Sequence, residues 1–233
     1  MHFELLPVLD TIITLYQQPA DMTRFKAYLS ILEGGTKGGL SVPIGAFNPM
    51  AKQAYINKLH ELTAINPEFI LDNTLRQVNT QINDYYKADN SVLKVCFNLA
   101  DDLKGGWTNR YTTDYSSKFK IAPLLSRGFC VPIFWVSEEF DEVIVKKRVL
   151  EYVYRTIYRS THKQPETLEE HILQEEFVAD SIGQIRSPRA VDLFYKQNRQ
   201  TTELPSIINY LYGDAAAIEL GYTPLDLTAY LEF

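Results

Sequence analysis

Apolar side chains recur at helical spacing along much of the first third of the chain. Leu71, Leu75, Val78 and Ile82 lie three or four positions apart, on one face of a helix that Pro67 begins. A second helix can be capped by an aspartate at its start and ended by a glycine pair. We therefore expect N-terminal helices at residues 7–17, 21–33, 49–64 and 67–85.

The hydrophobic period changes in the middle of the chain. Every second residue from 93 to 99 is apolar, as in a strand with one buried face. Residues 107–115 alternate in a similar way, and 129–136 form a nearly continuous apolar run that Pro132 interrupts. This pattern predicts a small antiparallel sheet of about three strands, with residues 100–106 as a hairpin loop.

Helical periodicity returns in the C-terminal part. Residues 138–161 form one long apolar helix, and the pair Thr167 and Glu170 has the spacing of a capping box for a helix at 168–186. Prolines favour three further helix starts, at residues 188, 205 and 223.

Together these elements predict an α+β fold that is predominantly helical, with the antiparallel sheet between the N-terminal and C-terminal helices. No stretch rich in proline, glycine and serine separates the parts, so we expect one domain over residues 1–233. The alternative is a boundary near residue 137, with helices and the small sheet before it and helices alone after it.

Composition and charge exclude several classes of function. The chain has 233 residues and a net charge of −6, whereas nucleic-acid binding requires a basic surface. Its longest run without a charged residue, 38–51, contains two prolines and is shorter than the ~20 residues of a membrane helix. Two cysteines suit a reducing compartment. We therefore expect a cytoplasmic protein that binds neither nucleic acid nor membrane.

Motifs for cofactors and metals are incomplete. The glycine-rich segment 34–41 has the outer glycines of a phosphate-binding loop, but Leu40 stands where that loop requires lysine. His60 precedes Glu61 as in a zinc-protease motif, yet Ala64 occupies the position of the second histidine. The sequence therefore predicts neither a cofactor nor a metal site.

Charged residues form a narrow stripe on the otherwise apolar long helix. This stripe includes Arg148, Arg155 and Arg159. On the next helix His171 and Glu175 fall on the apolar stripe, where burial without partners costs several kcal/mol. If the two helices pack as an antiparallel hairpin, Arg155 comes opposite His171.

Three interpretations of these facing polar groups stay open. In the first, the arginines pair with Glu151 and Glu175 in a buried structural network. In the second, His171 and Glu175 bind a metal, although two ligands are too few. In the third, the three arginines hold a carboxylate or phosphate while His171 and Glu175 perform acid–base catalysis.

A second polar patch lies around the predicted hairpin. Asp101, Asp102, Arg110 and Asp114 are close in sequence, and strand alternation places Arg110 and Asp114 on one face. A solvated strand face explains this pattern. The functional alternatives are paired carboxylates for hydrolysis or metal binding, and a ligand site to which Arg110 and Asp114 contribute.

These observations favour a globular domain that binds a protein partner or a small anionic ligand without catalysis. The alternative hypothesis is an enzyme that acts on a small anionic substrate through the facing Arg, His and Glu side chains. A solvent-filled cleft beside Arg155 favours the enzyme, and a dry seam favours a structural role.

Overall fold

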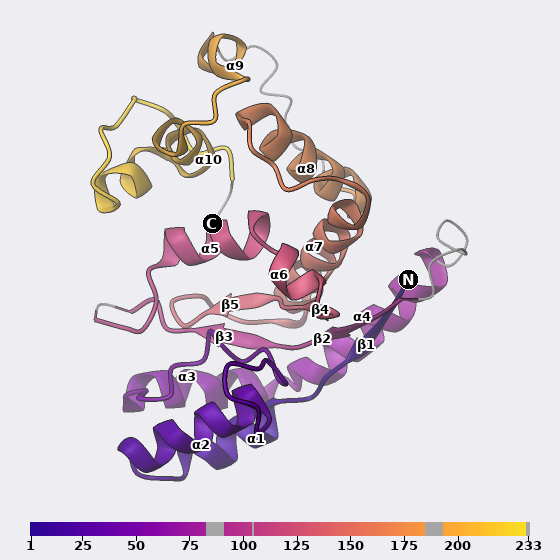
Figure 1. Ribbon diagram of the computed structural model, residues 1–233, viewed down its shortest axis with the longest axis vertical. Coiled ribbons are helices and arrows are strands. Elements are labelled where there is room, and N and C mark those ends of the chain that lie inside the picture. The colour runs from indigo at the N-terminus through magenta and orange to yellow at the C-terminus, as the bar shows by residue number, and fades with distance from the viewer. Residues whose placement is uncertain (83–90, 104, 185–192, 232–233) are drawn as a thin grey trace. The chain divides into compact units, whose positions relative to one another are not determined.

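The computed structural model describes residues 1–82, 91–103, 105–184 and 193–231 (Figure 1). The predicted helix end at residue 85 and helix start at residue 188 lie outside these ranges. The chain forms two compact units, Met1–Thr156 and Ile157–Phe233, which divide inside the long helix α7 (Glu142–Thr161). The one-domain organisation stays a prediction, and the division falls after the boundary considered near residue 137.

The first unit places helices on both sides of short strands. The strands are β1 (His2–Leu5), β2 (Val92–Val95), β3 (Asn98–Ala100), β4 (Phe129–Cys130) and β5 (Ile133–Trp135). The helices before α7 are α1 (Leu9–Tyr16), α2 (Met22–Glu33), α3 (Gln53–Ala64), α4 (Pro67–Ile82), α5 (Arg110–Phe119) and α6 (Ala122–Leu125). In Figure 1, α1–α4 lie on one side of the strands, and α5 and α6 lie on the other.

All strand pairs among the described residues are parallel, so the predicted α+β fold with an antiparallel sheet is wrong. β1 pairs with β2, β2 with β4, and β3 with β5. The Cys96 amide donates to Cys130 O (3.1 Å) and continues the pairing from one sheet to the other. Parallel neighbours require long crossover connections, which α1–α4 and α5–α6 supply. The strands on either side of the hairpin loop predicted at 100–106 are therefore not an antiparallel pair: β3 pairs with β5, and α5 follows the loop.

The expected alternation along residues 93–99 holds only in β2. Lys94 is exposed, but Cys96 and Asn98, which occupy the predicted polar face, are both 0% exposed. Parallel strands covered by helices on both faces bury both sets of side chains. Asn98 is accommodated because its Nδ2 donates to Pro43 O (2.8 Å) and its Oδ1 accepts from Ala46 N (3.2 Å).

Helix α5 occupies the segment in which we expected a second strand. Asn109 is its N-cap, because its Oδ1 accepts from Thr112 N (3.0 Å). Tyr115 and Phe119 then lie one turn apart on the buried side. Tyr111 and Tyr115 alternate along a strand but are also four positions apart, so this short pattern satisfied both periods. The N-cap hydrogen bond of Asn109 favours the helix over the strand in this segment.

Other predicted features of the first unit are confirmed. Asp21 caps α2 through a hydrogen bond of 2.7 Å, and Gly34 (φ 62) ends this helix in the left-handed conformation. The single strand predicted at residues 129–136 is instead two short strands, β4 and β5, with Pro132 between them. Helix α3 begins at Gln53, later than predicted, although Asn48 Oδ1 accepts a hydrogen bond from Met50 N (2.9 Å).

The regular secondary structure described in the second unit is helical. The end of α7 is followed by α8 (Leu168–Ser181), α9 (Leu193–Asn198) and α10 (Leu204–Glu219). The predicted capping box is present, with Glu170 N donating to Thr167 Oγ1 (3.2 Å) and Thr167 N donating to Glu170 Oε2 (3.0 Å). Within the ranges given above, no helix starts at Thr223, so that prediction is wrong.

Asn79 of α4 completes the edge strand β1, which the sequence analysis missed because four residues show too little periodicity. Its Oδ1 accepts from Phe3 N (2.9 Å), and its Nδ2 donates to Phe3 O (2.8 Å). One side-chain amide thus replaces a neighbouring strand on the side away from β2.

We predict that Asn79→Leu lowers the free energy of unfolding by about 2–4 kcal/mol, because it leaves the buried N–H and C=O of Phe3 without partners. Asn73→Ala, at a half-buried position of the same helix, should change it by less than about 0.5 kcal/mol. Urea unfolding measures both values. Equal losses in the two variants would contradict the role of Asn79.

Candidate functional site

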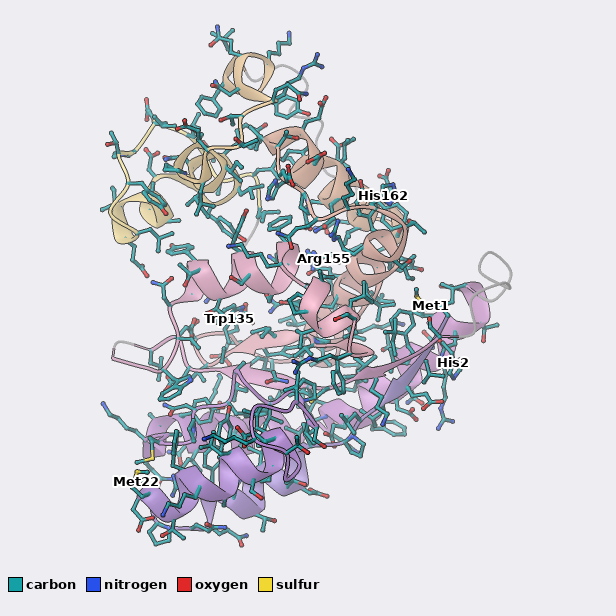
Figure 2. The ribbon with its side chains drawn as sticks, in the orientation of Figure 1. Met1, His2, Met22, Trp135, Arg155 and His162 are labelled. Carbon is teal, nitrogen blue, oxygen red and sulfur yellow. The ribbon has the colours of Figure 1, made fainter. Side chains whose placement is uncertain are left out.

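Charged side chains gather where β3 and β5 end, which is the edge at which ligands bind in many parallel sheets. Asp101 and Asp102 follow β3, and Ser137 and Glu138 follow β5. Figure 2 labels Trp135, the last residue of β5, and Arg155 on α7. We call the following group the carboxyl-edge cluster: Asp102, Arg110, Ser137, Glu138, Arg148, Glu151 and Arg155.

Glu138 links two arginines that come from different helices. Its Oε1 accepts from Arg110 Nη2 and from Arg148 Nη2, both at 3.0 Å. These contacts are charge-assisted hydrogen bonds. The sequence analysis assigned the two arginines to separate patches, and the structure joins them through one carboxylate.

Asp102 is surrounded by donors. Its Oδ1 accepts from Ser137 N (3.1 Å), and its Oδ2 accepts from Ser137 Oγ (2.6 Å) and Arg110 Nη1 (3.0 Å). The Asp102 side chain is only 2% exposed. These hydrogen bonds connect the end of β3 to the end of β5, so Asp102 has a structural role at this edge of the sheet.

Arg148 and Arg155 are also held by groups of the first unit. Arg148 Nη1 donates to Ile133 O (2.7 Å), and Glu151 Oε2 lies 4.0 Å from Arg148 Nε and 3.7 Å from Arg155 Nη1. Burial alone lowers the pKa of Arg148, but the charges of Glu138 and Glu151 raise it above its ordinary value. An anionic ligand would have to compete with these carboxylates.

Asp114, the other candidate on α5, pairs with Lys118 of the same helix at 2.7 Å. Both side chains are buried, and they are one helical turn apart. The helix places Arg110 and Asp114 one turn apart as well, but Arg110 reaches Asp102 and Glu138. The two predicted ligand residues thus take part in different ion pairs.

His171 and Glu175 lie on the buried face of α8 in the second unit, and both are 0% exposed. His171 Nδ1 lies 2.7 Å from Thr167 O, and Glu175 Oε1 accepts from Gln174 Nε2 (3.2 Å). Burial lowers the pKa of His171 below its ordinary value, so the ring is neutral at pH 7. Because Arg155 belongs to the first unit, its place opposite His171 stays a prediction.

The cysteines offer no reactive thiolate. Cys96 and Cys130 are both buried, and burial raises the pKa of each thiol, to about 12 for Cys130. In the part of the chain that the structure describes, no three His, Cys, Asp or Glu side chains converge as metal ligands would.

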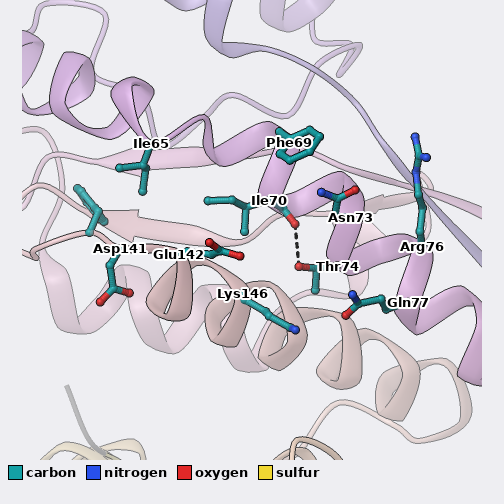
Figure 3. Close-up of a pocket in the computed structure, with 11 residues that line it drawn as sticks. Ile65, Phe69, Ile70, Asn73, Thr74, Arg76, Gln77, Asp141, Glu142 and Lys146 are labelled. Atoms are coloured by element: carbon teal, nitrogen blue, oxygen red, sulfur yellow. Dashed lines mark hydrogen bonds between the residues drawn. The ribbon is translucent and has the colours of Figure 1, made fainter.

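An open groove in the first unit lies between α4 and the start of α7, and we call it the α4–α7 groove (Figure 3). Its volume of about 690 Å³ is within the range of ligand-binding pockets. Its apolar lining comes from Ile65, Phe69, Ile70 and Phe140. Phe69 is 59% exposed, which leaves a large ring for contact with another molecule.

Polar side chains line both walls of the α4–α7 groove. Asn73 and Gln77 are one turn apart on α4, Asp141 directly precedes α7, and α7 contributes Glu142 and Lys146. In Figure 3, Glu142 is directed toward α4. Asp141 is occupied as a cap, because its Oδ1 accepts a backbone hydrogen bond (2.7 Å). Across the described ranges, no hydrogen bond or ion pair engages the side chains of the other four.

This groove could not be predicted from the sequence, for a physical reason. Its walls, residues 65–77 and 140–146, are far apart in the chain and meet only after folding. Polar side chains on the outer face of a helix are usually solvated, so the positions of Asn73 and Gln77 in the sequence do not indicate a binding site.

Comparisons with protein families, characterised proteins and solved structures found no match for this chain. Among the described helices, none has the length and hydropathy needed to cross a bilayer. Function is therefore inferred from the geometry of the groove and of the polar clusters.

We predict that Glu138→Gln lowers the free energy of unfolding by about 1–3 kcal/mol, because a neutral amide cannot balance Arg110 and Arg148. The neighbouring Glu139 is 94% exposed, so Glu139→Gln should change it by less than about 0.5 kcal/mol. Chemical unfolding of both variants measures the difference. If Glu138→Gln loses no more stability than the control, the cluster does not stabilise the sheet edge.

We predict that stability decreases as the pH falls below about 6.5, the ordinary pKa of histidine. The unfolded chain then binds a proton at His171 that the folded chain, with its lowered pKa, does not bind. The midpoint of thermal unfolding should depend less on pH in His171→Gln. His162 is exposed, so His162→Gln should retain the wild-type dependence. Identical pH profiles in all three proteins would exclude this role of His171.

Proposed function

We propose that this chain is a non-catalytic protein-binding domain, in which the α4–α7 groove holds an extended segment of a partner protein. The proposal rests on Asn73 and Gln77, two carboxamides beside an apolar surface with no partner among the described residues. An extended segment presents backbone N–H and C=O groups together. A carboxamide can pair with both, because it has a donor and an acceptor.

Helix α3 of the same unit provides a contrast. Gln53 and Asn57 are also one turn apart, but Gln53 Nε2 donates to Asn57 Oδ1 at 2.8 Å. These two amides partly satisfy each other, whereas the pair on α4 faces a groove with its hydrogen-bonding capacity intact. The α4 pair is therefore better suited to recognise a partner.

Apolar contact supplies the second part of the proposed recognition. Ile65, Phe69 and Ile70 form a continuous part of the α4 side of the groove. Burial of a large apolar side chain contributes about 1.5–3 kcal/mol, so one anchoring side chain of the partner would provide much of the affinity. The carboxamides would then fix the direction of the segment.

The charged side chains of the groove indicate which partner segments would bind there. Glu142 and Lys146 are one turn apart on α7, and neither joins an ion pair within the described residues. A segment with a basic side chain near Glu142 and an acidic one near Lys146 complements this arrangement. The chain's net charge of −6 further favours a basic partner.

The carboxyl-edge cluster lends no specific support to the enzyme alternative. Its arginines already contact Asp102, Glu138 and Glu151, so an anionic substrate would have to displace these carboxylates. Catalysis by His171 and Glu175 stays a prediction from the sequence.

Selection of random linear peptides against the full chain tests the proposed function. Fluorescence anisotropy then measures the Kd of a selected peptide for the wild type and for the double variant Asn73→Ala with Gln77→Ala. We expect the Kd to rise about tenfold or more in the double variant, which corresponds to ~1.4 kcal/mol.

The double variant Gln53→Ala with Asn57→Ala is the matched control, because it removes the same side chains at the same spacing from α3. Its Kd should equal that of the wild type. The proposal fails if selection yields no binding peptide, or if the α3 and α4 variants weaken binding equally.

A further inference from the structure

We propose that Arg159, in the last turn of α7, is the binding residue for the carboxylate of a ligand. Arg159 belongs to the second unit, and its side chain is only 7% exposed. Its Nε and Nη1 atoms are buried and find no hydrogen-bond acceptor among the described residues. Buried guanidinium groups are almost always paired. The missing partner is therefore an acceptor that comes from outside the described chain.

Two other arginines of the same helix lie near carboxylates. Arg148 Nη2 donates to Glu138 at 3.0 Å, and Arg155 Nη1 lies 3.7 Å from Glu151 Oε2. Arg159 has no carboxylate within ion-pair distance in the described ranges. Of the three arginines predicted to bind an anion, Arg159 is thus the one for which the described residues provide no carboxylate.

Glu170 is the carboxylate whose charge acts on Arg159, but it is already engaged. Glu170 Oε2 accepts from Glu166 N (2.8 Å) and Thr167 N (3.0 Å), which fixes it in the capping box. Burial lowers the pKa of Arg159, and the charges of Tyr158 and Glu170 offset this only in part. The guanidinium is therefore a desolvated cation with incomplete hydrogen bonding.

A carboxylate suits this guanidinium better than a phosphate does. A carboxylate oxygen accepts a charge-assisted hydrogen bond from the Nε–H or from an Nη1–H of this guanidinium. A carboxylate also carries one negative charge, so the nearby Glu170 repels it less than it repels a phosphate dianion. The site lies in the second unit and does not depend on the α4–α7 groove.

Arginine side-chain NMR on the full chain, with acetate as the probe, tests this inference. The Nε–Hε resonance of Arg159 is assigned by its loss in Arg159→Gln. At constant ionic strength this resonance should shift with acetate and reach saturation, and it should respond less to phosphate. The Arg199 resonance serves as the control, because that side chain is 59% exposed and lies 3.5 Å from Glu169.

Unfolding measurements separate ligand binding from a structural role. Without acetate, Arg159→Gln should unfold at the wild-type midpoint or above it, because it removes a buried charge that has no acceptor. Acetate should raise the midpoint of the wild type and of Arg199→Gln, and this rise should be lost in Arg159→Gln.

Three results would overturn the inference. The first is that the Arg159 resonance does not shift with acetate. The second is that phosphate shifts this resonance more strongly than acetate does. The third is that Arg159→Gln lowers the unfolding midpoint in acetate-free buffer. The last result would mean that the folded chain already supplies the acceptor.

Discussion

Parallel strands bring the residues that follow them to one edge, and in this chain those residues include two carboxylates. Asp102 follows β3 and Glu138 follows β5. Arg110 bridges them, with Nη1 on Asp102 and Nη2 on Glu138, each at 3.0 Å. The Asp102 side chain is 2% exposed and that of Glu138 is 16% exposed, so their negative charges would repel each other without this guanidinium. The pairing of β3 with β5 therefore depends on a residue of the intervening crossover helix, α5.

The internal ion pairs that neutralise Asp102 and Glu138 also determine where a ligand can bind. The edge that commonly holds a ligand in parallel sheets is closed here by ion pairs of the chain itself. Within the cluster, Glu138 Oε2 has no hydrogen-bond partner among the described residues, but it is an acceptor and cannot bind an anion. Unused donors are found in the carboxamides of Asn73 and Gln77 and in the guanidinium of Arg159. These groups suit different ligands, because amides complement a peptide backbone and a guanidinium complements a carboxylate.

Local signals in the sequence predicted local structure well. The capping box at Thr167 and the N-cap at Asp21 each depend on a few adjacent residues, and the structure contains both. Long-range features could not be derived in this way. Strand direction depends on how α5 and α6 connect β3 to β5, and the alternation around Tyr111 fits a strand and a helix equally. The sequence supplied the charged residues of the cluster but not their pairing, because Glu138 joins arginines of two different helices.

Chemical-shift mapping of a selected peptide on the full chain tests most directly whether the groove, rather than the carboxyl edge, is the binding surface. We expect the backbone amides of residues 65–77 and 140–146 to shift most, since these segments line the groove. Shifts centred on Asp102, Arg110 and Glu138 would contradict this, because they would mean that the ligand displaces the internal carboxylates of the carboxyl-edge cluster.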